Sequence, residues 1–174
     1  MALQTKTIYG STSSSNWTYK IELIENSIDE NNLTSNITMK LYLGRASGAS
    51  QTWFGGNLTS YYNCGGQTYS ETGYHTEGTV LPGQYYLIGT HTFNVSNTGS
   101  PTTINVSASM STSEFTPSSA SASGTMTLTE IIQGIFRLGN SSQWKNAVAY
   151  LGVNNQWKKC KVYFGDNNSW KKGV

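Results

Sequence analysis

Charged residues, cysteine and long apolar runs are all scarce in this 174-residue chain, and each shortage excludes a class of protein. Two cysteines, Cys64 and Cys160, are too few for a disulfide framework, so we expect two free thiols made in a reducing cytoplasm. The N-terminus MALQTKTIYG lacks the apolar run of a signal peptide, and no segment is apolar for long enough to cross a membrane. Only 11% of residues are charged, whereas 12% are aromatic, which argues against a disordered chain.

The few charges are divided unevenly along the chain. Residues 1–136 carry a net charge of −4, whereas residues 137–174 carry +6 with Asp166 as their one acidic residue. This division predicts that the two parts meet different surroundings. Ser, Thr, Asn and Gly take the place of the missing charged and apolar residues, and these residue types favour strands and turns over helices.

Alternating apolar and polar residues predict β-strands along residues 1–132. In NWTYKIELIE the apolar side chains share one face, and Thr18, Lys20 and Glu22 share the other. SNITMKLYLG, TTINVSASM and GTMTLTEI repeat this pattern, and QYYLIGTHTFNVS reads as a further strand interrupted near Gly89. Strands with one apolar face and one Ser/Thr face, joined by turns, predict an antiparallel β-sandwich over residues 1–132.

Two stretches of this region alternate less clearly. QTWFGGNLTSYYNCGGQTYSETGYHTEG, residues 51–78, has two Gly-Gly pairs and scattered aromatic residues, which we interpret as one or two hairpins with long loops. TSEFTPSSASASG, residues 112–124, is poor in apolar residues and predicts a loop or a solvated edge.

The chain ends in a repeat marked by tryptophan and lysine. A Trp-Lys pair recurs every 13 residues, and Asn154-Asn155 between two alternating runs predicts a tight hairpin turn. A tyrosine six residues after each of the first two tryptophans predicts that each pair shares one strand face. The predicted structural aromatic repeat consists of Trp144, Tyr150, Trp157, Tyr163 and Trp170. We therefore expect a connector at 133–138 and a small β-meander at 139–174, with lysines largely on the face opposite the aromatic residues.

The order of these segments resembles a known family. NWTYKIELIENSIDENNLTSNITMKLYL, GTHTFNVSNTGSPTTINVSASM and SASGTMTLTEI are similar to successive strands of β-sandwich domains in tail proteins of siphovirus-type phages that infect Gram-positive bacteria. The terminal W-K-x-A…Y-x-G-V-N…W-K is similar to repeats at the ends of phage tail and baseplate proteins. The family often has Pro-Arg after the closing isoleucine, whereas this chain reads Ile-Gln-Gly-Ile-Phe-Arg.

The resemblance implies an immunoglobulin-like β-sandwich in a tail or baseplate component of the virion, made in the host cytoplasm. Its partners would be other tail proteins or copies of itself, and no site residues are carried over from the family. A bacterial carbohydrate-binding or adhesin-type module is the alternative, which the missing signal peptide disfavours.

The sequence contains no motif that predicts an enzyme. G-x-S-x-G, the P-loop and H-E-x-x-H are all missing, and nothing places Glu71 and Glu77 as a glycosidase pair. We expect a non-enzymatic protein without a cofactor or metal. Two weaker alternatives are a transition metal on Cys64, His75 and His91, and a Ca²⁺ ion on oxygens of Glu25, Asp29, Asn31 and Asn32.

Two groups of residues are candidates for binding. The first is the aromatic middle region, whose rings suit sugar faces or protein interfaces, although part of it can equally fill the core: Trp53, Tyr61, Tyr62, Tyr69, Tyr74 and His75. The second is the basic surface of the terminal repeat, which either binds a polyanion or protects strand edges: Lys145, Lys158, Lys159, Lys161, Lys171 and Lys172. We expect neutral or anionic glycans of a Gram-positive wall as ligands, and neither nucleic acid nor a membrane.

Overall fold

The computed structural model describes residues 3–98, 101–131, 136–140, 143–147, 150–153, 156–159, 163–166 and 169–172, the last six ranges as backbone. In these residues all regular elements are β-strands, and none of them forms a helix long and apolar enough to cross a membrane. The chain divides into two compact units, residues 1–131 and 132–174. The prediction of an all-β protein is therefore confirmed.

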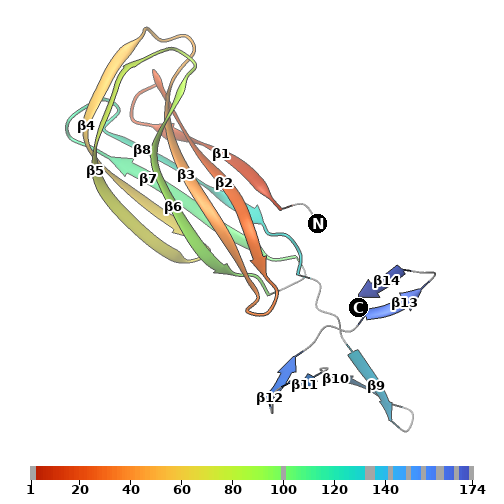
Figure 1. The fold of residues 1–174 in the computed structure, drawn as a ribbon. Coiled ribbons are helices and arrows are strands. Elements are labelled where there is room, and N and C mark those ends of the chain that lie inside the picture. The colour runs from red at the N-terminus through yellow and green to blue at the C-terminus, as the bar shows by residue number, and fades with distance from the viewer. Residues whose placement is uncertain are drawn as a thin grey trace. The chain divides into compact units, whose positions relative to one another are not determined.

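The first unit contains eight strands, in the order β5-β4-β7-β8-β1-β2-β3-β6, and every pair is antiparallel (Figure 1). Their bounds are β1 Thr5–Thr12, β2 Trp17–Asp29, β3 Thr34–Arg45, β4 Thr52–Cys64, β5 Gln67–Val80, β6 Tyr85–Ser96, β7 Thr103–Ser111 and β8 Ser119–Thr127. The strands enclose the core as a nearly closed sandwich, open only between the end strands β5 and β6.

Two long-range strand pairs build the sandwich: β3 pairs with β6, and β4 pairs with β7. β1 belongs to both layers, because Thr5–Gly10 pair with β2 and the next two residues, Ser11 and Thr12, pair with β8. The predicted sandwich is thus observed, with its two layers joined along one side by β1.

Strict alternation on β2 and β3 explains how the core forms. Trp17, Tyr19, Ile21 and Leu23 of β2 are buried, and the residues between them are half-exposed. On β3 the same is true of Ile37, Met39, Leu41 and Leu43. Burying one such aliphatic side chain contributes about 1.5–3 kcal/mol, so the inward faces of these strands supply a large part of the stability.

The middle region differs from the prediction of long loops. Residues 52–80 form a single long hairpin, β4–β5, in which Cys64 pairs with Gln67 around the two-residue turn Gly65-Gly66. Both glycines have positive φ, 59° and 87°, which a tight type I′ turn requires. The other pair, Gly55-Gly56, lies where the β4–β5 register shifts. The glycines that suggested loops therefore serve a turn and a bulge inside regular strands.

Two further predictions can be compared with the strands. The interruption expected near Gly89 is a register shift on β6, where Leu41 pairs with Gly89 but Tyr42 pairs with Leu87. Residues 112–118 lie outside the strands, as the low apolar content indicated, but Ser119–Gly124 belong to β8 between β7 and β1. These residues are not a sheet edge, because β8 pairs with β7 on one side and with β1 on the other, and Ala120 and Ala122 are buried between the serines.

The second unit contains three hairpins with equal register: β9 Phe136–Asn140 with β10 Gln143–Ala147, β11 Tyr150–Val153 with β12 Gln156–Lys159, and β13 Tyr163–Asp166 with β14 Ser169–Lys172. Each is a separate two-stranded sheet among the described residues, so the expected continuous meander is corrected to a series of hairpins. The reason is that each 13-residue repeat contains both strands of one hairpin, and these two strands pair with each other.

Candidate binding face

The outward face of strands β1, β8, β7, β4 and β5 is paved with small hydroxyl side chains. Alternation turns Ala108 and Ala122 inward, and it turns the serines between and beside them outward. One row across this face is formed by the register pairs Ser70–Tyr61, Tyr61–Ser109, Ser109–Ser121 and Ser121–Ser11. We call this surface the serine face: Ser11, Ser70, Ser107, Ser109, Ser121 and Ser123, with the tyrosines at its sides. Five adjacent strands span about 19 Å.

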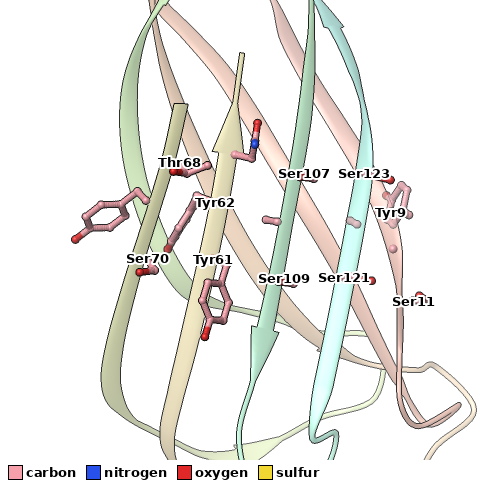
Figure 2. Close-up of a pocket in the computed structure, with 15 residues that line it drawn as sticks. Tyr9, Ser11, Tyr61, Tyr62, Thr68, Ser70, Ser107, Ser109, Ser121 and Ser123 are labelled. Atoms are coloured by element: carbon pink, nitrogen blue, oxygen red, sulfur yellow. The ribbon is translucent and has the colours of Figure 1, made fainter. Parts of the chain in front are cut away.

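Two tyrosines stand on the serine face at some distance from each other. Tyr9 of β1 is 70% exposed and Tyr61 of β4 is 49% exposed, which is unusual for such large aromatic side chains. Figure 2 shows Tyr9 beside Ser123 on one side and Tyr61 in front of β4 on the other, with the strands of the labelled serines between them. Exposed rings separated by a hydroxyl floor offer stacking surfaces to a ligand that spans several strands.

Gly10 allows β1 to approach β8 under this face. A Cβ atom at residue 10 would lie 2.1 Å from the backbone oxygen of Ser121 and 2.6 Å from the Cβ of Ala122. A larger residue would therefore push the two strands apart just where β1 leaves β2 and joins β8. The hollow on this face has a volume of about 1080 Å³.

The serine face carries no charge. Its lining consists of hydroxyl, phenol, amide and small apolar groups, with no Asp, Glu, Lys, Arg or His among them. A neutral lining neither attracts nor neutralises an ionic ligand, whereas hydroxyls that donate and accept hydrogen bonds suit a neutral polar ligand. The lining residues include no nucleophile–base pair and no paired carboxylates, and the groups that they offer are hydrogen-bonding hydroxyls and amides and exposed rings.

The six aromatic and histidine candidates of the middle region divide between two faces of the β4–β5 hairpin. Trp53 (60% exposed), Tyr61 and Tyr74 (62% exposed) point outward. Tyr62 is buried because it follows Tyr61 directly, and consecutive residues of a strand point to opposite sides. Tyr69 pairs with Tyr62, and His75 pairs with Gly56, so both follow the inward series and end at the open side of the sandwich, where Tyr69 is 38% exposed and His75 is half-buried.

Tyr62 makes a specific contact at that open side. Its hydroxyl donates a hydrogen bond to the carboxylate of Glu71, and burial together with this carboxylate raises the pKa of the Tyr62 phenol well above its usual range. Its ring lies against Tyr69 and His91, with centroid distances of 5.8 Å and 6.0 Å. Tyr62 therefore takes part in the packing of the sandwich, and it also lines the hollow of the serine face from below.

Sequence reasoning did not find Tyr9 or the serines of β1, β7 and β8. The available signal was the strict Ser/Ala alternation of residues 107–110 and 119–123, which marks one small, polar, outward side. What it could not show is that β1 and β8 are neighbours, since more than 100 residues separate Ser11 from Ser121. The pairing of β4 with β7 places Ser109 beside Tyr61, and the closure of β1 onto β8 adds Ser11 and Tyr9 to the same face.

In the terminal repeat the register places each tryptophan opposite a glycine: Trp144 with Gly139, Trp157 with Gly152 and Trp170 with Gly165. Lys145, Lys158 and Lys171 pair with the residue before that glycine. Lys159 and Lys172 lie two positions after a tryptophan, at the ends of β12 and β14. Lys161 lies outside the described residues.

The tyrosine spacing in the repeat is also corrected. Trp144 lies on β10 and Tyr150 on β11, which belong to different hairpins, and the same holds for Trp157 and Tyr163. Within a hairpin, Tyr150 pairs with Lys159 and Tyr163 pairs with Lys172. Each tryptophan lies on the second strand of a hairpin, and the tyrosine six residues later is the first residue of the next hairpin. The six-residue spacing therefore connects two different hairpins.

The residues considered for metals serve other purposes. Glu25 is buried, and its carboxylate accepts hydrogen bonds from Gln4 N, Ser35 Oγ and the backbone and hydroxyl of Thr129. Asp29 accepts hydrogen bonds from Asn31 and Asn32 within its own turn, and those from Asn32 hold the pKa of Asp29 below its usual value. Among the described residues no three His, Cys, Asp or Glu side chains form a group that could hold a metal ion.

No protein-family model matches this sequence, and the comparison with curated proteins finds no match either.

Proposed function

We propose that this protein is a non-enzymatic structural component of a phage tail or baseplate whose sandwich contacts neutral glycans of the host surface through the serine face. The observation that carries the glycan part is the uncharged hollow between Tyr9 and Tyr61. Sugar rings present C–H faces that stack on exposed aromatic rings and hydroxyl rims that bond to serines. The volume of the hollow, about 1080 Å³, exceeds that of a usual small-molecule pocket and suits a chain of sugars.

The arrangement favours a carbohydrate over a protein partner. Stable protein–protein interfaces have an apolar centre that excludes water, with bulky anchors filling pockets. The centre of the serine face consists of Ser107, Ser109, Ser121 and Ser123, and its bulky rings stand at the sides. A hydroxyl floor of this kind gains more from a ligand that is itself rich in hydroxyl groups.

The tail assignment has a different basis. It rests on the resemblance of the strand segments and of the terminal Trp-Lys repeat to phage tail and baseplate proteins. Three hairpins of equal register are consistent with a repeated contact to other tail proteins or to copies of the same chain. The positive charge of residues 137–174 would add attraction to an anionic wall polymer, an effect that salt weakens.

The second candidate function is a bacterial carbohydrate-binding or adhesin-type module. The same serine face supports it, so the two candidates differ in where the protein resides and not in what it binds. Antibodies against the protein would label tails of purified virions under the first proposal. Labelling of bacterial surfaces in uninfected cells, with unlabelled virions, would favour the second.

The glycan contact is tested by retention of the full-length protein on Gram-positive cell walls and on isolated neutral wall polysaccharide. We expect Tyr9→Ala and Tyr61→Ala each to reduce retention about tenfold, at low and at high salt, because each removes one stacking ring. Tyr74→Ala is the matched control, since Tyr74 is equally exposed but does not line the hollow. Equal retention of all three variants and the parent protein would rule out the serine face as the site.

The contribution of the basic repeat is separated by salt and by truncation. A protein lacking residues 139–174 should keep its salt-insensitive binding to neutral polysaccharide and lose only a salt-sensitive part on whole walls. Binding that is entirely salt-sensitive and disappears with the truncation would instead assign wall recognition to the repeat.

A further inference from the structure

The open side of the sandwich, between β5 and β6, is bridged by side chains and not by a backbone ladder. We call it the seam; each of its strands pairs with a single neighbour, β5 with β4 and β6 with β3. At one end Gln67 Nε2 donates a hydrogen bond to the backbone oxygen of Asn94 at 2.6 Å. Next to it the ring of Tyr69 stacks on His91, with centroids 3.6 Å apart and planes within 10°. This end of the seam is closed.

Tyr62 and Gly89 end the closed part. The hydroxyl of Tyr62 reaches the carboxylate of Glu71 on β5 and lies against Gly89 on β6, where a Cβ atom would be 2.0 Å from it. Beyond this contact the seam opens into a second cavity of about 280 Å³. The register shift of β6 lies here, between Gly89 and Leu87, and bulges of this kind often accompany functional sites.

The lining of the seam cavity combines aliphatic and polar groups. Leu58 and Ile88 are buried and provide an apolar wall. Ser60, Glu71, His75 and Thr90 provide hydroxyl, carboxylate and imidazole groups. Apolar surface with a few convergent polar groups is the usual composition of a small-molecule site.

The buried, unpaired hydroxyl of Ser60 is the observation that indicates a ligand. This residue is fully buried, and its hydroxyl makes no hydrogen bond of normal geometry in the structure. The Tyr62 phenol lies close by, but its geometry toward the Ser60 hydroxyl is not that of a hydrogen bond, and the Tyr62 hydroxyl already donates to Glu71. Buried hydroxyls almost always have partners, because an unpaired one is unfavourable. A group that enters the seam cavity would supply the partner that Ser60 lacks.

We propose that the seam cavity binds one neutral sugar ring or a polyol of similar size. The Ser60 hydroxyl and the Glu71 carboxylate would hydrogen-bond to ligand hydroxyls, while Leu58 and Ile88 contact its C–H face. An anion is excluded by the carboxylate of Glu71, and a metal ion would find one carboxylate already engaged by Tyr62. The lining of the seam cavity shares no residue with the hollow of the serine face, and Ser60 and Glu71 point to the opposite side of the β4–β5 hairpin from Tyr61 and Ser70.

Two substitutions separate binding from folding. Ser60→Ala removes the unpaired hydroxyl without adding bulk, so it should leave stability unchanged or raise it. Gly73→Val fills the cavity; a Cβ at residue 73 would meet only His75 Nε2 at 3.8 Å, and its backbone has no positive φ that would oppose a side chain. Ser109→Ala on the serine face is the matched control, because it removes a hydroxyl from the other site.

The experiment is a titration of the full-length protein with glucose, galactose, N-acetylglucosamine and glycerol, followed by amide chemical shifts in NMR spectra. We expect saturable shifts at residues 60, 73 and 89 for at least one probe, weakened about tenfold by Ser60→Ala and abolished by Gly73→Val. Ser109→Ala should bind like the parent protein. If Gly73→Val does not fold, Ser60→Ala decides alone.

Three results would overturn the proposal: no saturable shift at the seam with any of the four probes, shifts that persist unchanged in Ser60→Ala, or shifts that persist in folded Gly73→Val. Loss of wall retention in Tyr61→Ala with seam binding intact would concern the serine face only. The failure of either site is thus visible separately.

Discussion

The hydroxyl oxygen of Tyr62 occupies the space that a side chain at residue 89 would need. A Cβ built on Gly89 would lie 2.0 Å from that oxygen and 3.0 Å from the Glu71 carboxylate. Tyr62 comes from β4 and Gly89 from β6, strands of opposite layers, so this contact joins the two layers at the side where no ladder closes the sandwich.

We predict that Gly89→Ala destabilises the first unit by about 1–3 kcal/mol, because the added methyl group overlaps the Tyr62 hydroxyl and the strand must shift. The measurement is the free energy of unfolding from denaturant titration. Gly48→Ala is the control, since a Cβ there meets nothing within 4 Å, and it should change stability by less than about 0.5 kcal/mol.

The cause can be isolated with Tyr62→Phe, which removes the clashing oxygen. Combined with Gly89→Ala, it should lose less stability than the sum of the two single variants, because the two residues contact each other. Strict additivity would show that the glycine is needed for its backbone and not for the tyrosine.

Glu25→Gln should cost about 2 kcal/mol of unfolding free energy. The buried carboxylate accepts hydrogen bonds from Gln4 N, Ser35 Oγ and Thr129 N, and an amide nitrogen in place of one oxygen would face these donors. Denaturant unfolding at neutral pH measures the loss. Glu130→Gln is the control, because Glu130 is exposed, and it should leave stability nearly unchanged.

Cys64 should behave as an inert thiol in the folded protein. It is fully buried and free of disulfides, and burial raises the pKa of its thiol from 9.0 to about 11. The thiolate is the reactive form, so alkylation at pH 8 should be slow until denaturant unfolds the first unit. Mass spectrometry in a Cys160→Ser background measures it, and rapid alkylation of the native protein would contradict the burial of this residue.

The same thiol makes stability depend on pH in one direction. Its folded pKa lies above the unfolded value of 9.0, so the folded state holds the proton more tightly, and the contribution is complete below pH 9 and decreases toward pH 11. The unfolding free energy of the parent protein should therefore fall more between pH 9 and pH 11 than that of Cys64→Ala. Equal slopes for both proteins would exclude this contribution.

Removal of residues 139–174 should leave the unfolding of the first unit cooperative and its midpoint nearly unchanged. The first compact unit ends at Ile131, whose side chain is buried within it, and Asn97 and Glu25 hold Thr129 there by hydrogen bonds. Calorimetry of the truncated and full-length proteins tests this. A lost or broadened transition would mean that the terminal hairpins complete the core of the sandwich.

Several features of the fold could be predicted from residue order. Alternation on residues 17–25 and 35–45 determines which side chains are buried, because a strand in a sandwich has one face toward the solvent and one toward the core. The interruption near Gly89 and the 13-residue repeat were equally visible. The prediction of long loops in the middle region was wrong, because a Gly-Gly pair indicates a turn or a bulge as readily as a loop. Only the pairing with a partner strand distinguishes these three structures.

The candidate site, too, could be predicted only in part from the sequence. Local alternation already required Tyr61 and Tyr62 to point to opposite sides, and it gave residues 107–110 and 119–123 one hydroxyl face. Only the tertiary structure showed that Ser11 pairs with Ser121 and that Tyr9 lies on the same face as these serines. The contact between Tyr62 and Gly89 also came from the tertiary structure alone. The physical reason is that strand pairing between residues more than 100 positions apart is set by closure of the whole sandwich around its core, which no local pattern encodes.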